Sequence, residues 1–93
     1  MREALIVTRH LGLVEWLARR GIVGEVRAHV DDDDVGGRLV VGVLPLHLAA
    51  RAWRIITVDM PGMPAERRGA EATPEEMDSW GARMTTYRVR RKK

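Results

Sequence analysis

Short apolar runs separated by polar segments dominate the pattern of the chain. Runs rich in Val, Ile and Leu occupy residues 4–7, 22–30, 38–43 and 54–59, and each predicts a β-strand, with a last strand at 84–89. The run at 38–43 is the most apolar, which favours a central place in a sheet. Residues 22–30 alternate apolar with charged side chains, which is typical of a half-exposed edge strand.

Helical patterns fill the spaces between these strands. Residues 11–20 carry apolar side chains at helical spacing, Pro45 suits the first turn of a second helix, and a capping box at Thr73 begins a third. The acidic run Asp31–Asp34 predicts a turn that repulsion between like charges keeps extended. The alternation of strands and helices predicts one α/β domain over residues 1–93, with a mostly parallel sheet flanked by helices.

Composition narrows the class of protein. The 93 residues carry 16 Lys and Arg against 13 Asp and Glu, a formal net charge of +3, and no cysteine. The lack of thiols excludes disulfides and thiolate metal sites and suits a cytoplasmic protein. No apolar stretch approaches the roughly 18–20 residues that cross a bilayer, so no membrane partner is expected. The positive charge permits a polyanionic ligand, although part of it lies in a basic tail, residues 90–93, that we expect to be flexible.

Polar residues follow two predicted strands at their carboxyl ends. Thr8, Arg9 and His10 come directly after the first strand, and Leu44 and Pro45 follow the central one. Ligands gather at such ends in open α/β sheets. Arginine binds phosphate oxygens, histidine transfers protons near neutral pH, and the next helix offers free N–H groups. This turn therefore predicts a phosphate site; the alternative is a solvated turn in which the threonine only caps the helix.

A second candidate anion contact lies in the loop after the strand at 54–59. Arg67 and Arg68 precede Gly69, whose backbone freedom would let the loop approach an anion; the alternative is an ordinary surface loop. Glu71 is expected to pair with one of these two arginines. No histidine has a second ligand at metal-binding spacing, so the sequence predicts no metal site.

Taken in order, these motifs resemble a family of small proteins encoded beside type III CRISPR systems. The similarity extends from Val7 to Val89 and rests on Thr8-Arg9-His10-x-Gly12, on Gly42-x-Leu44-Pro45, on Arg67 or Arg68 with Gly69 and Glu71, and on Gly81-Ala82-Arg83. Thr8 stands where the family usually has serine and keeps a hydroxyl. Val43 stands where threonine is common, so no hydroxyl role carries over to that position.

The resemblance implies a minimal Rossmann-like, CARF-like domain that acts as a homodimer. It also implies a ring nuclease that opens cyclic tetra-adenylate and so switches off type III CRISPR antiviral signalling. We expect Arg9 to stabilise phosphate charge, His10 to transfer a proton or contact phosphate, and Thr8 to orient the ligand through a hydrogen bond from its hydroxyl. The ligand-binding residues implied are Gly12, Gly42, Leu44, Pro45, Arg67, Arg68 and Gly69.

The expected reaction needs neither metal nor cofactor, because the ribose 2′-hydroxyl of the ligand attacks the adjacent phosphorus and yields linear products with a 2′,3′-cyclic phosphate. Two alternatives stay open. A non-catalytic protein that sequesters the same cyclic oligoadenylate would have nearly the same sequence features. A general RNA-binding domain would instead use the tail from Arg88 to Lys93, although no stable long nucleic-acid partner is expected.

Overall fold

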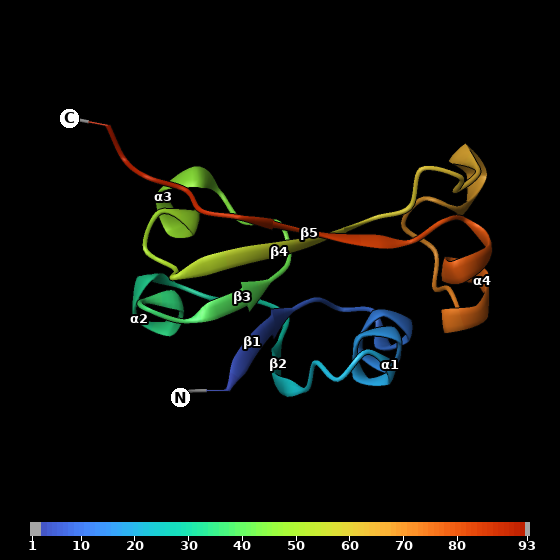
Figure 1. Ribbon diagram of the computed structural model, residues 1–93, viewed down its shortest axis with the longest axis horizontal. Coiled ribbons are helices and arrows are strands. Elements are labelled where there is room, and N and C mark those ends of the chain that lie inside the picture. Colours follow the sequence, from blue (N-terminus) through green and yellow to red (C-terminus); the bar gives the residue numbers. More distant parts are fainter. Residues whose placement is uncertain (1–2, 93) are drawn as a thin grey trace.

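A five-stranded sheet runs through the middle of the protein, which a computed structural model describes over residues 3–92 (Figure 1). The strands lie in the order β2-β1-β3-β4-β5; β1 to β4 are parallel and β5 pairs antiparallel with β4. In chain order the elements are β1 (Ala4–Val7), α1 (Leu11–Arg19), β2 (Gly24–Arg27), α2 (Asp32–Val35), β3 (Leu39–Val41), α3 (Leu46–Ala49), β4 (Arg54–Asp59), the 3-10 turn η1 (Ala65–Arg67), α4 (Pro74–Ser79) and β5 (Arg83–Tyr87). The prediction of an α/β fold with a mostly parallel sheet is confirmed.

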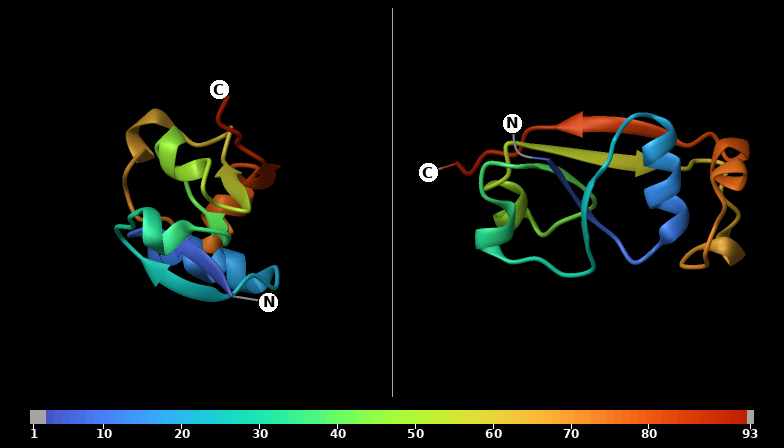
Figure 2. Two further views of the ribbon diagram at one scale, coloured as in Figure 1. Left: turned by 90° about the vertical axis from the view of Figure 1, so that its left-hand side faces the viewer. Right: turned by 90° about the horizontal axis from the view of Figure 1, so that it is seen from below.

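Each face of the sheet buries its own hydrophobic core. Neighbouring strand residues point to opposite faces, so Leu5 and Val40 pack toward α2 and α3, whereas Ile6 and Val41 pack toward α1 and α4. Figure 1 and the right panel of Figure 2 show the helices in the same two groups, α2 and α3 toward one end of the molecule and α1 and α4 toward the other. Because β1 and β3 are buried on both faces, their residues are apolar without alternation, which explains the continuous apolar runs in the sequence.

Strand positions follow the predicted hydrophobic pattern. β3 occupies the middle of the sheet and β2 one edge, as predicted, although both are shorter than the apolar runs that contain them. The predicted capping box of α4 is present: the Thr73 side chain accepts a hydrogen bond from the Glu76 N–H, and the Glu76 carboxylate accepts one from the Thr73 N–H. No helix within residues 3–92 has the length and apolar character that crossing a membrane requires.

The acidic run differs from its prediction. Instead of an extended turn it forms the short helix α2, which Asp31 caps by accepting a hydrogen bond from the Asp34 N–H at 3.1 Å. The Asp34 carboxylate accepts a hydrogen bond from the Asp31 N–H at 2.8 Å and pairs with Arg27 at 3.0 Å. The prediction was wrong because these bonds, together with the positive end of the helix, offset the repulsion between the carboxylates.

Candidate functional site

The connections of the sheet diverge between β1 and β3. From β1 the chain passes through α1 to β2 on one side, and from β3 it passes through α3 to β4 on the other. Open α/β sheets bind ligands at the carboxyl ends of two neighbouring strands whose connections diverge in this way. Thr8–His10 follow β1 and Gly42–Pro45 follow β3, so the topology brings two of the predicted motifs together.

Gly42 lets the two strand ends approach closely. Its φ of +143° is rarely adopted by residues with a side chain, and a Cβ there would lie 2.8 Å from the carbonyl oxygen of Val7. Its N–H donates to the Ile56 carbonyl at 2.9 Å, which continues the contact with β4. Gly42 therefore supports the site through the backbone, and Leu44 packs against the core on the α2 and α3 side.

Arg9 turns toward the end of the edge strand. Its guanidinium donates from Nη2 to Nε2 of His29 at 2.6 Å. Because a guanidinium has only donors, Nε2 must be the acceptor, and the proton of a neutral His29 lies on Nδ1. Within residues 3–92 no other hydrogen bond or ion pair involves the Arg9 side chain, so its remaining donors face solvent at the carboxyl edge of the sheet.

His10 turns the other way and meets Glu71. Its Nδ1 lies 3.2 Å from Oε2 of Glu71, while Oε1 of the same carboxylate accepts a hydrogen bond from the Gly12 N–H at 2.9 Å. A carboxylate only accepts, so Nδ1 carries the proton and Nε2 is left as an acceptor. The imidazole is half-exposed, with 47% of its side-chain surface accessible, which leaves Nε2 able to meet a ligand.

The Glu71 carboxyl group is ionised at neutral pH. The hydrogen bond from the Gly12 N–H, followed by that from His10, holds the pKa of Glu71 below its usual value of 4.5. Gly12 lies in the first turn of α1, so this carboxylate occupies the helix N-terminus that the sequence assigned to a phosphate. The prediction that the Glu71 side chain pairs with Arg67 or Arg68 was wrong, because the backbone of η1 and the next loop turns it toward α1.

Thr8 shapes the turn through its hydroxyl. Oγ1 accepts a hydrogen bond from the His10 N–H at 3.1 Å, and the Thr8 N–H donates to the Arg27 carbonyl at 2.9 Å. The threonine thus holds the backbone of His10 in place, while its own hydroxyl proton stays available to a ligand.

Pro45 follows the neighbouring strand β3 and is the N-cap residue of α3. Its carbonyl accepts hydrogen bonds from the Leu48 and Ala49 N–H groups.

A cavity of about 310 Å³ opens beside His10. Arg68, Gly69 and Ala70 line it from the loop after η1, so His10 and two of the predicted loop residues share one hollow. The rest of its wall is apolar and comes from α1, β4, α4 and the segments next to them.

The two neighbouring arginines have different environments. Arg67 pairs with Glu76 at 2.6 Å, donates to the Glu71 carbonyl at 3.3 Å and lies over the Trp80 ring at 5.1 Å. Within the described part of the chain the Arg68 side chain has no hydrogen bond or ion pair, and it lines the cavity. Arg67 therefore ties the loop to α4, and Arg68 is the one positioned to contact a ligand.

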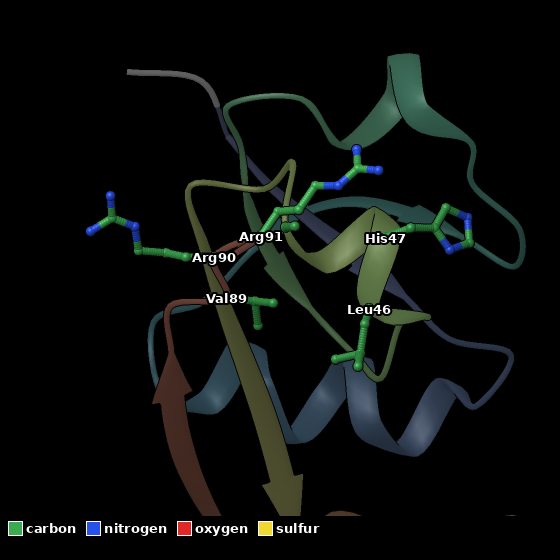
Figure 3. A pocket seen from close by; sticks show the side chains of 6 residues that line it. Leu46, His47, Val89, Arg90 and Arg91 are labelled. Carbon is green, nitrogen blue, oxygen red and sulfur yellow. The ribbon is translucent and has the colours of Figure 1, made fainter. Parts of the chain in front are cut away.

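A separate basic hollow of about 370 Å³ lies between α3 and the segment after β5 (Figure 3). Its lining combines apolar and basic side chains: Leu46, Ala50, Val89, His47, Arg90 and Arg91. Figure 3 shows Arg90 pointing away from His47 and Arg91 pointing toward the side of His47, so the two arginines do not converge on one ligand position. This is the surface that the general RNA-binding alternative would use.

Sequence reasoning did not include His29 in the site and assigned Glu71 the wrong partner. Arg9 and His29 are 20 residues apart and His10 and Glu71 are 61 apart, so neither contact is visible as a motif. The sequence position of His29 was a weak indication, because it comes shortly after β2, the strand that neighbours β1. Within residues 3–92 no group of three or more histidine and carboxylate side chains is placed to hold a metal ion.

A family model matches most of the chain. It is described as "Putative CRISPR-associated protein (Cas_VVA1548)" and aligns with residues 5–90. The matched range contains the Thr8–His10 turn, the Gly42–Pro45 segment and the loop that carries Arg68. No curated protein and no solved structure matches the chain.

Proposed function

The chain belongs to the Cas_VVA1548 family of CRISPR-associated proteins, and from this premise we propose that it is a ring nuclease that cleaves cyclic tetra-adenylate and so ends type III CRISPR signalling. One observation carries the proposal. The His10 imidazole is oriented by Glu71, leaves Nε2 free, and stands beside a cavity that Arg68 also lines. A histidine held by a carboxylate and facing a ligand-sized hollow is suited to proton transfer.

The ligand supplies its own nucleophile in this reaction. The ribose 2′-oxygen forms a bond to the adjacent phosphorus, and the bond from phosphorus to the 5′-oxygen breaks. Nε2 of His10 accepts the 2′-hydroxyl proton, and the departing 5′-oxygen takes a proton from water. Glu71 stabilises the imidazolium that forms and keeps its Nδ1 proton in place. The products are linear and end in a 2′,3′-cyclic phosphate.

Arg9 and Thr8 act on the phosphate in this proposal. Negative charge builds on the phosphate oxygens as the pentacoordinate state forms, and the free donors of Arg9 are placed at the same sheet edge to stabilise it. The Thr8 hydroxyl, which already accepts from the His10 N–H, donates its proton to a phosphate oxygen. Because the Arg9 guanidinium is exposed, it reaches the phosphate by exchanging its bond to His29 for bonds to the ligand.

A homodimer completes the proposed site. A two-fold axis lets each subunit offer the same residues to half of a ring of four equivalent nucleotides. Support comes from three apolar side chains at the carboxyl edge of the sheet: Leu11 is 77% exposed, Val43 87% and Leu46 75%. Large apolar groups this exposed beside a polar site are typical of a surface that a partner covers. A second copy would bury them and enclose the ring.

Labelled cyclic tetra-adenylate incubated with the purified protein in excess EDTA tests the proposal. We expect linear products carrying a 2′,3′-cyclic phosphate, identified by mass spectrometry. Ligand that stays intact and bound to the protein would identify the sequestering alternative instead. Ligand that stays intact and unbound would contradict both.

Histidine substitutions locate the chemistry. We expect His10→Ala to slow single-turnover cleavage at least about a hundredfold, the usual range for loss of a general base, while ring binding is largely retained. His47→Ala removes an imidazole that lines the separate basic hollow beside α3 instead of the cavity beside His10, and serves as the control with an unchanged rate. An unchanged rate in His10→Ala would exclude the proton-transfer role.

A further inference from the structure

We propose that the cavity beside His10 is a nucleobase subsite, which receives one purine base of the ligand and so makes the site selective for purine over pyrimidine nucleotides. The inference rests on the proposed function of the same site and adds which part of the ligand this cavity binds. It depends on the chemistry of the cavity wall, on its size and on its position relative to His10.

The wall of the cavity is suited to a flat, weakly polar ring. Three thioethers line it: Met77 forms part of the buried core with 2% exposure, and Met60 and Met63 are half-buried at the sides. Leu13 and Val58 complete the apolar surface. Methionine adapts its shape and makes favourable contacts with aromatic rings, so this wall fits the face of a base better than it fits a phosphate or a sugar.

The mouth of the cavity is suited to the polar edge of the same base. The Arg68 side chain lines it with no hydrogen-bond or ion-pair partner among residues 3–92, and its planar guanidinium can stack on a base or donate to a ring nitrogen. Gly69 has a φ of +79°, and a Cβ built there would have no neighbour within 4 Å, so the backbone at the mouth is open. The loop thus offers one cation beside a backbone position, Gly69, that no side chain covers.

The dimensions and position of the cavity agree with this occupant. Its volume of about 310 Å³ is at the lower end of the range for small-molecule sites and accommodates a purine with part of its ribose. His10 belongs to the same wall, so a base held there places its own ribose and phosphate next to Nε2. The subsite therefore sets which phosphodiester faces the imidazole.

Methionine methyl groups provide a direct test, because three of the five methionines line the cavity and Met84 on β5 does not. Protein labelled with ¹³C at the methionine methyls is titrated with adenosine 5′-monophosphate, uridine 5′-monophosphate and ribose 5-phosphate. With the adenine nucleotide we expect saturable ring-current shifts at Met60, Met63 and Met77 and none at Met84. The uracil nucleotide should bind more weakly, and ribose 5-phosphate should leave the methyls unshifted.

A matched pair of variants checks that the wall makes the contact. Met63→Ala should weaken binding of adenosine 5′-monophosphate by about tenfold, the size of effect seen when a stacking contact is lost. Met84→Ala, the same change on an exposed strand, should leave it unchanged. Circular dichroism confirms that both variants fold.

The outcomes separate this inference from the proposed function. Three results would overturn the nucleobase subsite even if the protein cleaves the ring. They are methionine methyl shifts with ribose 5-phosphate as large as those with adenosine 5′-monophosphate, equal affinity for the two nucleotides, and no methyl shift at millimolar nucleotide. Saturable and purine-selective shifts at the three methionines would support the subsite even if the ring stays intact.

Discussion

At the scale of single residues, the hydrogen bond between Nδ1 of His10 and the Glu71 carboxylate decides which imidazole nitrogen can act on a ligand. With Nδ1 protonated, Nε2 becomes the acceptor. Glu71 is held in this position by the Gly12 N–H, which also keeps its pKa below the ordinary value. In the proposed reaction Glu71 is thus a positioning residue, which acts on the ligand only through His10.

Glu71→Gln should reverse this arrangement. The amide oxygen of glutamine can still accept from the Gly12 N–H, but its amino group would then donate to Nδ1 and move the histidine proton to Nε2. We expect ¹⁵N chemical shifts of His10 at alkaline pH to change from the Nδ1-protonated to the Nε2-protonated tautomer, with the fold unchanged. A tautomer that matches the wild type would show that Glu71 does not set it.

At the scale of elements, the first turn of α1 and the Glu71–Ala72 segment are in direct backbone contact. A Cβ on Gly12 would lie 1.7 Å from the Ala72 carbonyl oxygen and 3.3 Å from Oε1 of Glu71. Only glycine fits at position 12, and the close approach of the two backbones brings the Glu71 carboxylate within reach of His10. The loop before α4 is therefore fixed against α1 by contact between backbones and by the bonds of Glu71.

Gly12→Ala should destabilise the protein. The methyl group would push the two backbones apart and cost about 1–3 kcal/mol or more in the free energy of unfolding, the range for overpacking at a close contact. Gly36→Ala is the control, because its Cβ would meet only the Asp32 carbonyl oxygen at 3.7 Å, an ordinary contact. Urea denaturation of both variants measures the difference, and equal midpoints would contradict the close approach.

Elements with a local signal were predictable, and contacts between distant segments were not. Continuous apolar runs gave the strands, and the Thr73 capping box gave the start of α4, because these features depend on neighbouring residues. The α2 helix was missed although Asp31 and Asp34 stand at capping spacing, since four adjacent charges suggested repulsion. The choice between Arg67 and Arg68 depends on how the loop lies against α4, which no local pattern records.

At the scale of the whole molecule, the carboxyl edge of the sheet combines the candidate site with exposed apolar side chains. The sequence placed its two motifs at strand ends, and the strand order brings those ends side by side. Val43, 87% exposed, lies directly after Gly42. In the proposed dimer this edge is the interface, so oligomeric state and ligand binding depend on the same surface.

Val43→Asp should separate the subunits. A carboxylate at the centre of an apolar contact loses its water without gaining a partner, so we expect a monomer by analytical ultracentrifugation and loss of ring binding. Val23→Asp is the matched control. Val23 is also exposed, at 69%, but it precedes β2 and so lies at the amino end of the parallel strands, opposite to Val43. A monomeric wild-type protein, or a dimer that persists in Val43→Asp, would contradict this arrangement.

Acid should weaken the contact between α1 and α4. The pKa of Glu71 is lowered chiefly by the Gly12 N–H and that of Asp78 chiefly by the indole N–H of Trp16, from ordinary values of 4.5 and 3.8. Because the pKa of each group is lower in the folded state, both carboxylates stabilise the fold when the pH is above their ordinary pKa values. This stabilisation is lost as the pH falls through the folded-state pKa of each group. Asp78→Asn should therefore show a smaller fall in denaturation midpoint on acidification than the wild type, and an equal fall would contradict this assignment.

Single-turnover cleavage of cyclic tetra-adenylate by the wild type, Arg9→Ala and Arg51→Ala, all in excess EDTA, decides whether the protein is a ring nuclease. Arg9 is the residue to which the proposed function assigns stabilisation of phosphate charge, whereas Arg51 is an exposed arginine after α3 and is the matched control for loss of charge. We expect full cleavage by the wild type and Arg51→Ala, and a rate lowered by at least about a hundredfold in Arg9→Ala. Full activity in Arg9→Ala, or an intact ring with all three proteins, would contradict it.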